Sequence, residues 1–168
     1  AFMPMAFSAD TQLTTTAANG LGIIAWDSEP FSVVKEANFS LWAVAEVISF
    51  DQIAVSISGS QNPQVVFFNP MKPSPNMRRF RTGGKRALSS LALTEDQRFL
   101  MGTDLAGFVS VWDLQSQSQN PETRFSSQRL AAYRVESFQS DERLATGGLG
   151  NDLLKVWHFD STKQPIAV

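Results

Sequence analysis

The stretch 91–113, LALTEDQRFLMGTDLAGFVSVWD, decides the fold because the chain repeats its pattern. Two further copies stand at 5–27, MAFSADTQLTTTAANGLGIIAWD, and at 137–159, SFQSDERLATGGLGNDLLKVWHF. Each copy alternates apolar and polar residues, makes an acidic turn, passes through a second short segment and a Gly/Asn turn, and ends its third segment around a Trp. The chain is therefore a series of one small unit.

The spacing within the units is constant. Sixteen residues separate a turn aspartate from the closing tryptophan in three pairs, Asp10 and Trp26, Asp96 and Trp112, and Asp141 and Trp157. A fourth unit lies at 42–69, where Asp51 and Phe68 are 17 residues apart and Phe68 replaces the Trp. The closing aromatic residues recur at intervals of 42, 44 and 45 residues. A period of about 40–45 residues with several short strands per unit is typical of β-propeller blades.

The third unit shows why each blade should be a four-stranded antiparallel sheet. Alternation of apolar and polar residues predicts strands over 87–94, 98–103 and 108–114. The polar residues 95–97 and the segment 104–107 form the turns between them, and Gly107 can adopt a positive φ. Each unit then needs an outer strand, for which the candidates are 30–36, 76–82, 123–128 and 164–168. Helical periodicity is absent almost everywhere, so we expect an all-β protein.

The closing motifs resemble those of WD40-repeat β-propellers. They are Ala25-Trp26-Asp27, Val111-Trp112-Asp113, Val156-Trp157-His158 and the weaker Phe67-Phe68-Asn69. The resemblance implies a single propeller segment over 1–168, with blades near 1–36, 37–82, 86–128 and 129–168. The structural residues of the repeat would be Trp26, Asp27, Phe68, Trp112, Asp113, Trp157, Asp10, Asp96 and Asp141. The Gly-His dipeptide of the family is missing from every unit, and Asp104 resembles the aspartate of the family's buried His–Asp relay.

The number of visible units predicts an incomplete ring. Four units are present, whereas the family usually closes with about seven blades. We expect the remaining blades in a further stretch of chain or on a partner, because an open arc exposes apolar blade faces. Closure of a four-bladed ring by the C-terminal tail and a symmetric ring of two copies are the alternatives.

Composition argues against an enzyme. The 168 residues include no Cys and only one His, His158, and the formal net charge is −2. Disulfides, zinc fingers and most His-dependent catalytic sites are thereby excluded, and we expect no cofactor, metal or small-molecule substrate. The sequence has no apolar run long enough to span a membrane as a helix, and its apolar start AFMPMAF is without the basic n-region expected of a signal peptide. We therefore expect an intracellular protein, cytoplasmic or nuclear.

One basic cluster is a candidate anion site. Its members are Arg78, Arg79, Arg81 and Lys85, with Lys72 and Arg86 beside them. Arginines that bind phosphate oxygens in bidentate fashion would suit a phosphoinositide, a phosphopeptide or RNA. The alternative is a solvated outer strand with Arg79 and Arg81 outward and Phe80 inward. The slightly acidic net charge and the lack of interleaved aromatic residues favour this alternative.

Propellers usually bind partners through the loops that lead into the innermost strands and the turns between second and third strands. The first set supplies Asn38, Phe39, Arg86 and Arg129, and the second supplies Asn19, Ser60, Gln61, Asn62, Asp104, Leu105, Asn151 and Asp152. The sequence thus predicts a non-catalytic protein–protein interaction scaffold within a multi-subunit assembly. The alternative function is phosphate-ligand binding through the cluster Arg78–Arg86.

Overall fold

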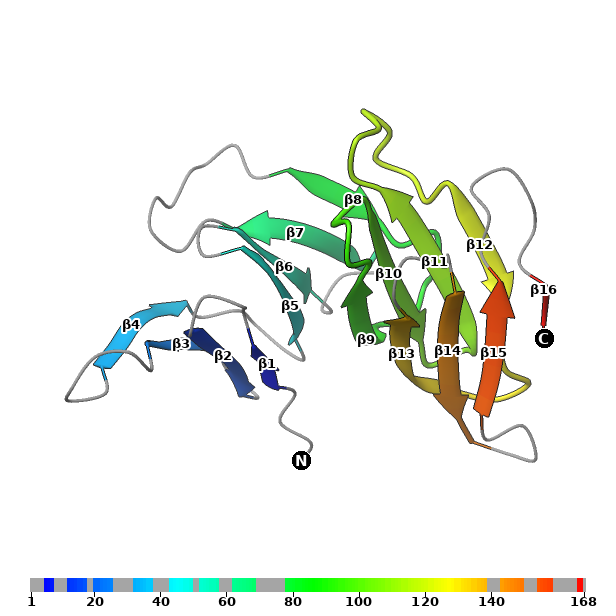
Figure 1. Ribbon diagram of the computed structural model, residues 1–168, viewed down its shortest axis with the longest axis horizontal. Helices are drawn as coiled ribbons and strands as arrows, with labels where there is room; N and C mark the ends of the chain where they lie inside the picture. The colour runs from blue at the N-terminus through cyan, green and yellow to red at the C-terminus, as the bar shows by residue number, and fades with distance from the viewer. Residues whose placement is uncertain are drawn as a thin grey trace.

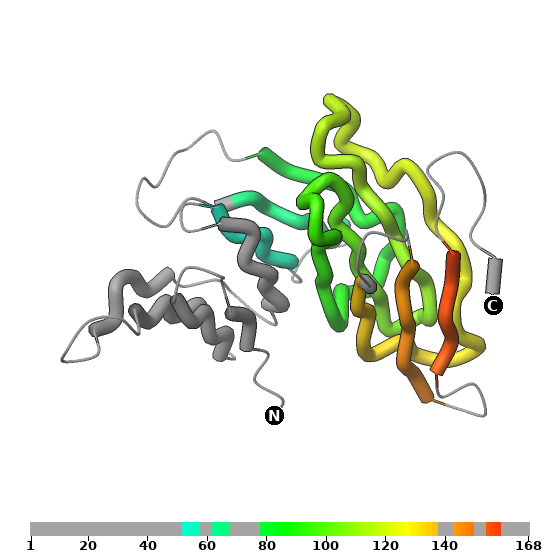
Figure 2. The backbone as a smooth tube through the Cα atoms, in the orientation of Figure 1, coloured from blue at the N-terminus to red at the C-terminus, as the bar shows by residue number. Residues whose placement is uncertain are grey.

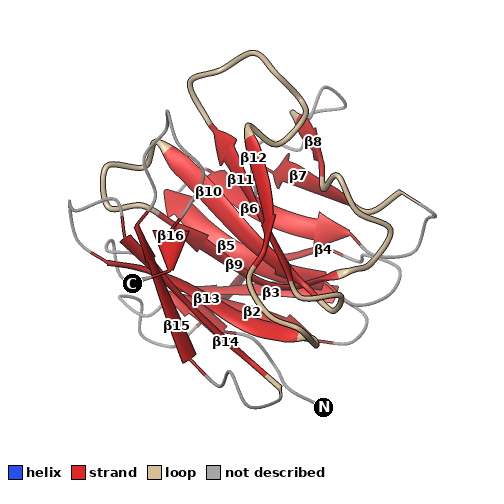
Figure 3. Ribbon diagram, turned by 90° about the vertical axis from the view of Figure 1, so that its right-hand side faces the viewer, coloured by secondary structure: helices blue, strands red, loops and turns tan. Residues whose placement is uncertain are grey.

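The computed structural model consists of β-strands, and none of the residues that it describes is helical (Figure 3). Backbone and side chains are described for residues 52–57, 62–67, 78–137, 143–149 and 154–158, and strand backbone alone at Phe68, at Phe138 and in β1–β5 and β16. The strands are β1 (Met5–Phe7), β2 (Gln12–Ala17), β3 (Gly20–Ala25), β4 (Ser32–Ala37), β5 (Ala43–Ser49), β6 (Gln52–Ile57), β7 (Gln64–Phe68), β8 (Arg79–Arg81), β9 (Leu88–Leu93), β10 (Phe99–Asp104), β11 (Phe108–Asp113), β12 (Thr123–Ser126), β13 (Ala132–Phe138), β14 (Arg143–Gly148), β15 (Leu154–His158) and β16 (Ile166–Ala167).

Four consecutive strands form each sheet. The sheets are β1–β4, β5–β8, β9–β12 and β13–β16, and every neighbouring pair is antiparallel. Each sheet is therefore a meander that begins with its innermost strand and ends with its outermost one. The predicted all-β class and four-stranded antiparallel blades are confirmed, and we number the sheets blade 1 to blade 4.

The innermost strands bring the blades together. Strands β1 and β2 lie beside β5, β5 lies beside β9, and β13 lies beside both β9 and β10. Figure 1 shows the sheets following one another in an open arc, with the strands of each blade fanning outward. Figure 2 shows the described segments of blades 2 to 4 as coloured tubes that follow the same path. This arrangement is that of a β-propeller whose ring is not closed by these four blades.

Apolar side chains fill the spaces between blades. One buried cluster joins blades 2 and 3 and consists of Ala54, Val65, Phe67, Phe80, Leu88, Leu91, Leu100 and Trp112. A second joins blades 3 and 4 and consists of Ala92, Phe99, Met101, Val109, Val111, Val135, Leu144 and Trp157. The alternation of side chains along a strand lets blade 3 contribute to both clusters, one from each face.

An aromatic contact recurs at both interfaces. Phe80 in β8 meets Trp112 edge-on, with ring centroids 6.5 Å apart. Phe125 in β12 meets Trp157 in the same way at 4.9 Å. Each Phe comes from the outer strand of one blade and each Trp from the third strand of the next. The closing tryptophans therefore stabilise the packing of each blade on its predecessor.

Some of the predicted repeat residues lie within the described part of the chain and others lie outside it. Asp113 accepts a hydrogen bond from the Arg98 guanidinium at 3.2 Å, and the Asp96 carboxylate accepts from the Thr94 hydroxyl and from the Arg98 backbone amide. Gly107 adopts a φ of 85°, as expected. Predicted repeat positions that lie outside the described residues are Asp10, Trp26, Asp27 and Asp141, and Phe68 is described only as part of β7.

Candidate functional site

One end of blades 3 and 4 collects the loops that lead into the innermost strands and the turns between second and third strands. The register places Asp104 opposite Leu88 and Gly148 opposite Ala132, so β10 and β14 end where β9 and β13 begin. We call this end the loop face. It comprises the loop 82–87, the turn 105–107, the loop 127–131, Tyr133, Leu149 and Leu154.

The Asp104 carboxylate organises the turn that follows it. Its Oδ1 accepts hydrogen bonds from the backbone amides of Ala106 at 2.8 Å and Phe108 at 3.1 Å. The Gly107 amide donates to the Asp104 carbonyl at 3.0 Å. This side-chain-to-backbone pattern is how aspartate shapes a tight turn. The Asp104 side chain is therefore occupied within the turn.

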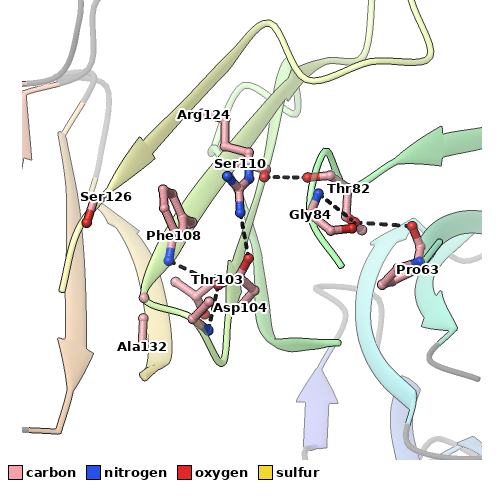
Figure 4. Close-up of polar contacts among 12 residues, drawn as sticks. Pro63, Thr82, Gly84, Thr103, Asp104, Phe108, Ser110, Arg124, Ser126 and Ala132 are labelled. Carbon is pink, nitrogen blue, oxygen red and sulfur yellow. Dashed lines mark hydrogen bonds and ion pairs between the residues drawn. The ribbon is translucent and has the colours of Figure 1, made fainter. Parts of the chain in front are cut away.

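Arg124 completes the partners of this carboxylate. Its Nη2 donates to Asp104 Oδ2 at 2.9 Å, and its guanidinium carbon lies 3.9 Å from the centroid of the Phe108 ring (Figure 4). A Cβ added at Gly84 would come within 2.9 Å of the same Nη2. The loop ahead of β9 therefore approaches the ion pair closely, and a side chain at Gly84 would require the Arg124 guanidinium to shift. The resemblance described above would place a histidine in this loop as the partner of the aspartate. In this blade the partner of Asp104 is Arg124, which comes from the outer strand.

Gly107 joins the turn to the next loop. Its carbonyl accepts hydrogen bonds from the amides of Ser127 at 2.8 Å and Gln128 at 3.0 Å. A Cβ on Gly107 would lie 2.3 Å from the Leu130 carbonyl oxygen, inside any permitted contact distance. The positive φ and this close approach both require glycine. The loop that leads into blade 4 is thus held against blade 3.

Gln128 anchors the same loop to blade 4. Its Nε2 donates to the Thr146 hydroxyl at 3.3 Å, and Trp157 Nε1 donates to that hydroxyl at 3.0 Å. Thr146 and Gln128 are buried. This buried contact links the loop 127–131, the second strand and the third strand of blade 4. A hydrogen-bonded buried group of this kind fixes one loop conformation.

A β-bulge turns Tyr133 outward. In β13, Ala132 pairs with Gly148 and Arg134 with Gly147, which leaves Tyr133 as the extra residue. Bulges re-aim side chains at the ends of sheets. Next to it, the Leu149 amide donates to the Ala131 carbonyl at 3.1 Å. The loops of blades 3 and 4 therefore form one connected backbone surface.

The side chains on this surface are strongly apolar. The large hydrophobic residues that are exposed in the described part of the chain are Leu105, Leu130, Tyr133, Leu149 and Leu154, at 47% to 70% exposure. Every one of them belongs to the loop face. Gathering of this kind distinguishes a binding surface from the isolated exposed leucines found on most proteins.

The charges around these residues are positive. Lys85, Arg86 and Arg129 are exposed in the two loops. Within the segments 82–87, 105–107 and 127–131 there is no carboxylate, and Asp104 beside them is buried and paired. Over its described loops 82–87, 105–107 and 127–131, the loop face is therefore an apolar surface with a basic border.

The predicted loop residues divide into three groups. Arg86, Arg129, Asn62 and Leu105 are exposed, whereas Asp104 is 3% exposed and supports the turn. Predicted contacts that lie outside the described residues are Asn19, Asn38, Phe39, Ser60, Gln61, Asn151 and Asp152. Leu130, Tyr133, Leu149 and Leu154 were missed by the sequence analysis. A leucine inside a polar or Gly-rich connection was the available signal.

The residues of the predicted basic cluster lie in different surroundings. Phe80 is buried at 1% exposure, while Arg79 and Arg81 on either side of it are exposed. Arg78 donates to the carbonyls of Leu114 and Ser116 and lies over the Phe80 ring. Lys85 stands in the loop 82–87 and belongs to the loop face.

No cluster of three or more His, Cys, Asp or Glu side chains suited to a metal ion occurs among the described residues. Within that same part of the chain, no helix has the length and apolar character needed to cross a bilayer.

Comparison with known proteins identifies the fold. No family model matches the sequence, and no curated protein matches it. The chain is similar in structure to the β-propeller domain of Cps50 (Swd1) from Myceliophteria thermophila, with a TM-score of 0.76 and 12% sequence identity. The alignment covers 98% of this chain and 55% of the other, so this chain spans about half the length of that neighbour. The likeness confirms the β-propeller fold.

Proposed function

We propose that this chain is a non-catalytic protein-interaction scaffold whose loop face docks an acidic partner segment that carries bulky apolar side chains. The single observation that carries the proposal is that all five large hydrophobic side chains exposed in the described residues lie at one end of blades 3 and 4. The propeller fold supports it by analogy, because rigid blades commonly present loops for recognition. Work within a multi-subunit assembly, and an intracellular location, are parts of the same proposal.

Burial of the apolar side chains would provide the affinity. The loops that carry them are fixed by the bonds of Gly107, Gln128 and Ala131, so little conformational entropy is lost on binding. Leucine and tyrosine side chains in such a setting each contribute roughly 1–3 kcal/mol when a partner covers them. A partner segment with leucine or aromatic residues would match this surface.

Charge selects the partner further. The exposed cations Lys85, Arg86 and Arg129 border the apolar residues, and the nearby carboxylate of Asp104 is already paired. An acidic segment would gain from complementarity and a basic one would be repelled. Binding should accordingly weaken as salt screens the charges.

A peptide-display selection on the folded chain tests the proposal. We expect enriched peptides to combine Asp or Glu with Leu, Phe or Trp, and their affinity to fall at least tenfold in the double variant Leu130→Ser/Leu149→Ser. The matched control is Glu95→Ser/Gln117→Ser, which alters two exposed residues away from the loop face. Enriched peptides without acidic residues, or equal binding by both variants at unchanged melting temperature, would contradict the proposal.

A further inference from the structure

We propose that Arg79 and Arg81, together with the amide side chains of Gln64 and Gln119, form a binding site for the phosphate group of a phosphorylated Ser or Thr segment. The site lies on the outer strand of blade 2, separate from the loop face, and does not rest on the docking function proposed there. These four side chains line a surface hollow of about 240 Å³.

Three segments bound this hollow. Strand β8 supplies Arg79 and Arg81, β7 supplies Gln64 opposite Arg81, and the connection from β11 to β12 supplies Gln119. The Arg81 amide donates to the Gln119 carbonyl at 2.7 Å, which holds that connection along the edge of β8. The outer edge of blade 2 is therefore closed by a loop of blade 3, and the hollow lies where they meet.

Arg78 fixes the base of the site. Its guanidinium donates to the Leu114 carbonyl at 2.7 Å and to the Ser116 carbonyl, and it lies 4.6 Å from the centroid of the Phe80 ring. These bonds use two of its five N–H donors and leave its positive charge in place beside the hollow. Arg78 thus joins blades 2 and 3 and adds to the positive electrostatic potential near the hollow. We do not expect it to bind the phosphate directly.

The remaining polar side chains can act as donors. The lining residues are Gln64, Arg78, Arg79, Phe80, Arg81 and Gln119, and none is a carboxylate. Arg79 makes only a long contact of 3.5 Å to Gln64 Oε1, which leaves the Gln64 NH₂ group directed elsewhere. No ion pair to Arg79 or Arg81 is formed by the carboxylates that the structure describes. Two guanidinium groups and two amides around one hollow suit a dianionic phosphate.

The surroundings favour a phosphorylated protein segment over a membrane or RNA. A lipid-binding site would need exposed apolar side chains beside it, but those in the described residues lie on the loop face and Phe80 is buried. RNA binding would need exposed aromatic rings for base stacking, and the hollow offers none. A phosphorylated side chain needs only the guanidinium and amide donors that line the hollow.

The probe for this site is a peptide library with a fixed central phosphoserine and random flanks, measured on the whole chain against the same library with serine. We expect phosphorylated peptides to bind at least tenfold more tightly, and inorganic phosphate to compete. The variant Arg79→Gln/Arg81→Gln should lose this preference. Arg134→Gln/Arg143→Gln removes the same charge from exposed positions of blade 4, outside both the hollow and the loop face, and should keep it.

Other results would overturn the proposal. Equal losses in the two charge-matched variants would indicate attraction to net charge alone. Binding of phosphoinositide vesicles or an RNA oligonucleotide through Arg79 and Arg81, without a preference for phosphopeptides, would assign the hollow to a different ligand. Because Leu130 and Leu149 lie elsewhere, the variant Leu130→Ser/Leu149→Ser should retain phosphopeptide binding, which separates this site from the loop face.

Discussion

Arg124 in the outer strand of blade 3 donates from Nη2 to Asp104 Oδ2 at 2.9 Å, although 20 residues and one complete strand separate them. The other oxygen of the Asp104 carboxylate, Oδ1, accepts hydrogen bonds from two turn amides, and the Arg124 guanidinium lies over the Phe108 ring. The pair therefore ties three parts of one blade together beneath the loop face.

Removal of Arg124 should uncouple this arrangement. In Arg124→Met the Asp104 side chain, which is 5% exposed, loses its cationic partner. We expect a loss of about 3 kcal/mol in the free energy of unfolding, because a buried charge without a partner is costly. Asp104→Asn retains an acceptor for the turn amides and should cost less. A double-mutant cycle measured by chemical denaturation checks this, and strictly additive losses would show that the two side chains are not coupled.

Gly107 should tolerate no side chain. Gly107→Ala places a Cβ 2.3 Å from the Leu130 carbonyl oxygen on a residue with a φ of 85°. The loop 127–131 must move, so we expect a loss of at least about 2 kcal/mol together with loss of peptide binding at the loop face. Gly83→Ala is the matched control, because its φ is 71° but its nearest neighbours are side-chain atoms of Arg124 and Pro121. Gly83→Ala should cost about 1 kcal/mol and preserve peptide binding. Similar effects of both substitutions would show that the close contact between Gly107 and the loop 127–131 does not hold that loop in place.

The regular parts of the fold were predictable and the irregular parts were not. A constant 16-residue spacing reflects two hairpins of fixed length, so it located the blades and the buried Trp112 and Trp157. The Asp104–Arg124 pair depends on which side chain reaches across a sheet, and no local pattern carries that information. Tyr133 is exposed through a one-residue bulge that alternation alone does not reveal. The alternative interpretation of the basic strand, with Phe80 inward and its neighbours outward, describes β8 correctly.

Asp96 should give the blade a small acid sensitivity. The Thr94 hydroxyl and the Arg98 backbone amide, which both donate to its carboxylate, hold the pKa of Asp96 below its usual value. A group whose pKa is lowered by folding contributes stability above its unfolded pKa and loses it as the pH falls through the folded value. The loss should therefore occur as the pH falls below about 3.9, the ordinary pKa of an aspartate.

Because Asp96 is largely exposed, solvent screening limits the effect to about 0.5 kcal/mol or less. Unfolding curves at pH 6 and pH 3 should show a smaller pH dependence for Asp96→Asn than for the wild-type chain. Glu95→Gln removes the adjacent exposed carboxylate of the same turn and serves as the control. An unchanged pH dependence in Asp96→Asn would mean that other carboxylates dominate acid unfolding.

Thr146 should couple blade stability to the shape of the loop face. Its hydroxyl accepts from Trp157 Nε1 at 3.0 Å and from Gln128 Nε2 at 3.3 Å, and the residue is fully buried. Thr146→Val keeps the volume but leaves two buried N–H donors with one acceptor fewer, so we expect a loss of about 2 kcal/mol. Loosening of Gln128 should also weaken peptide binding at Leu130. Thr146→Ser retains the hydroxyl and should restore peptide binding, whereas a failure of Ser to rescue would assign the effect to the methyl group and not to the hydrogen bonds.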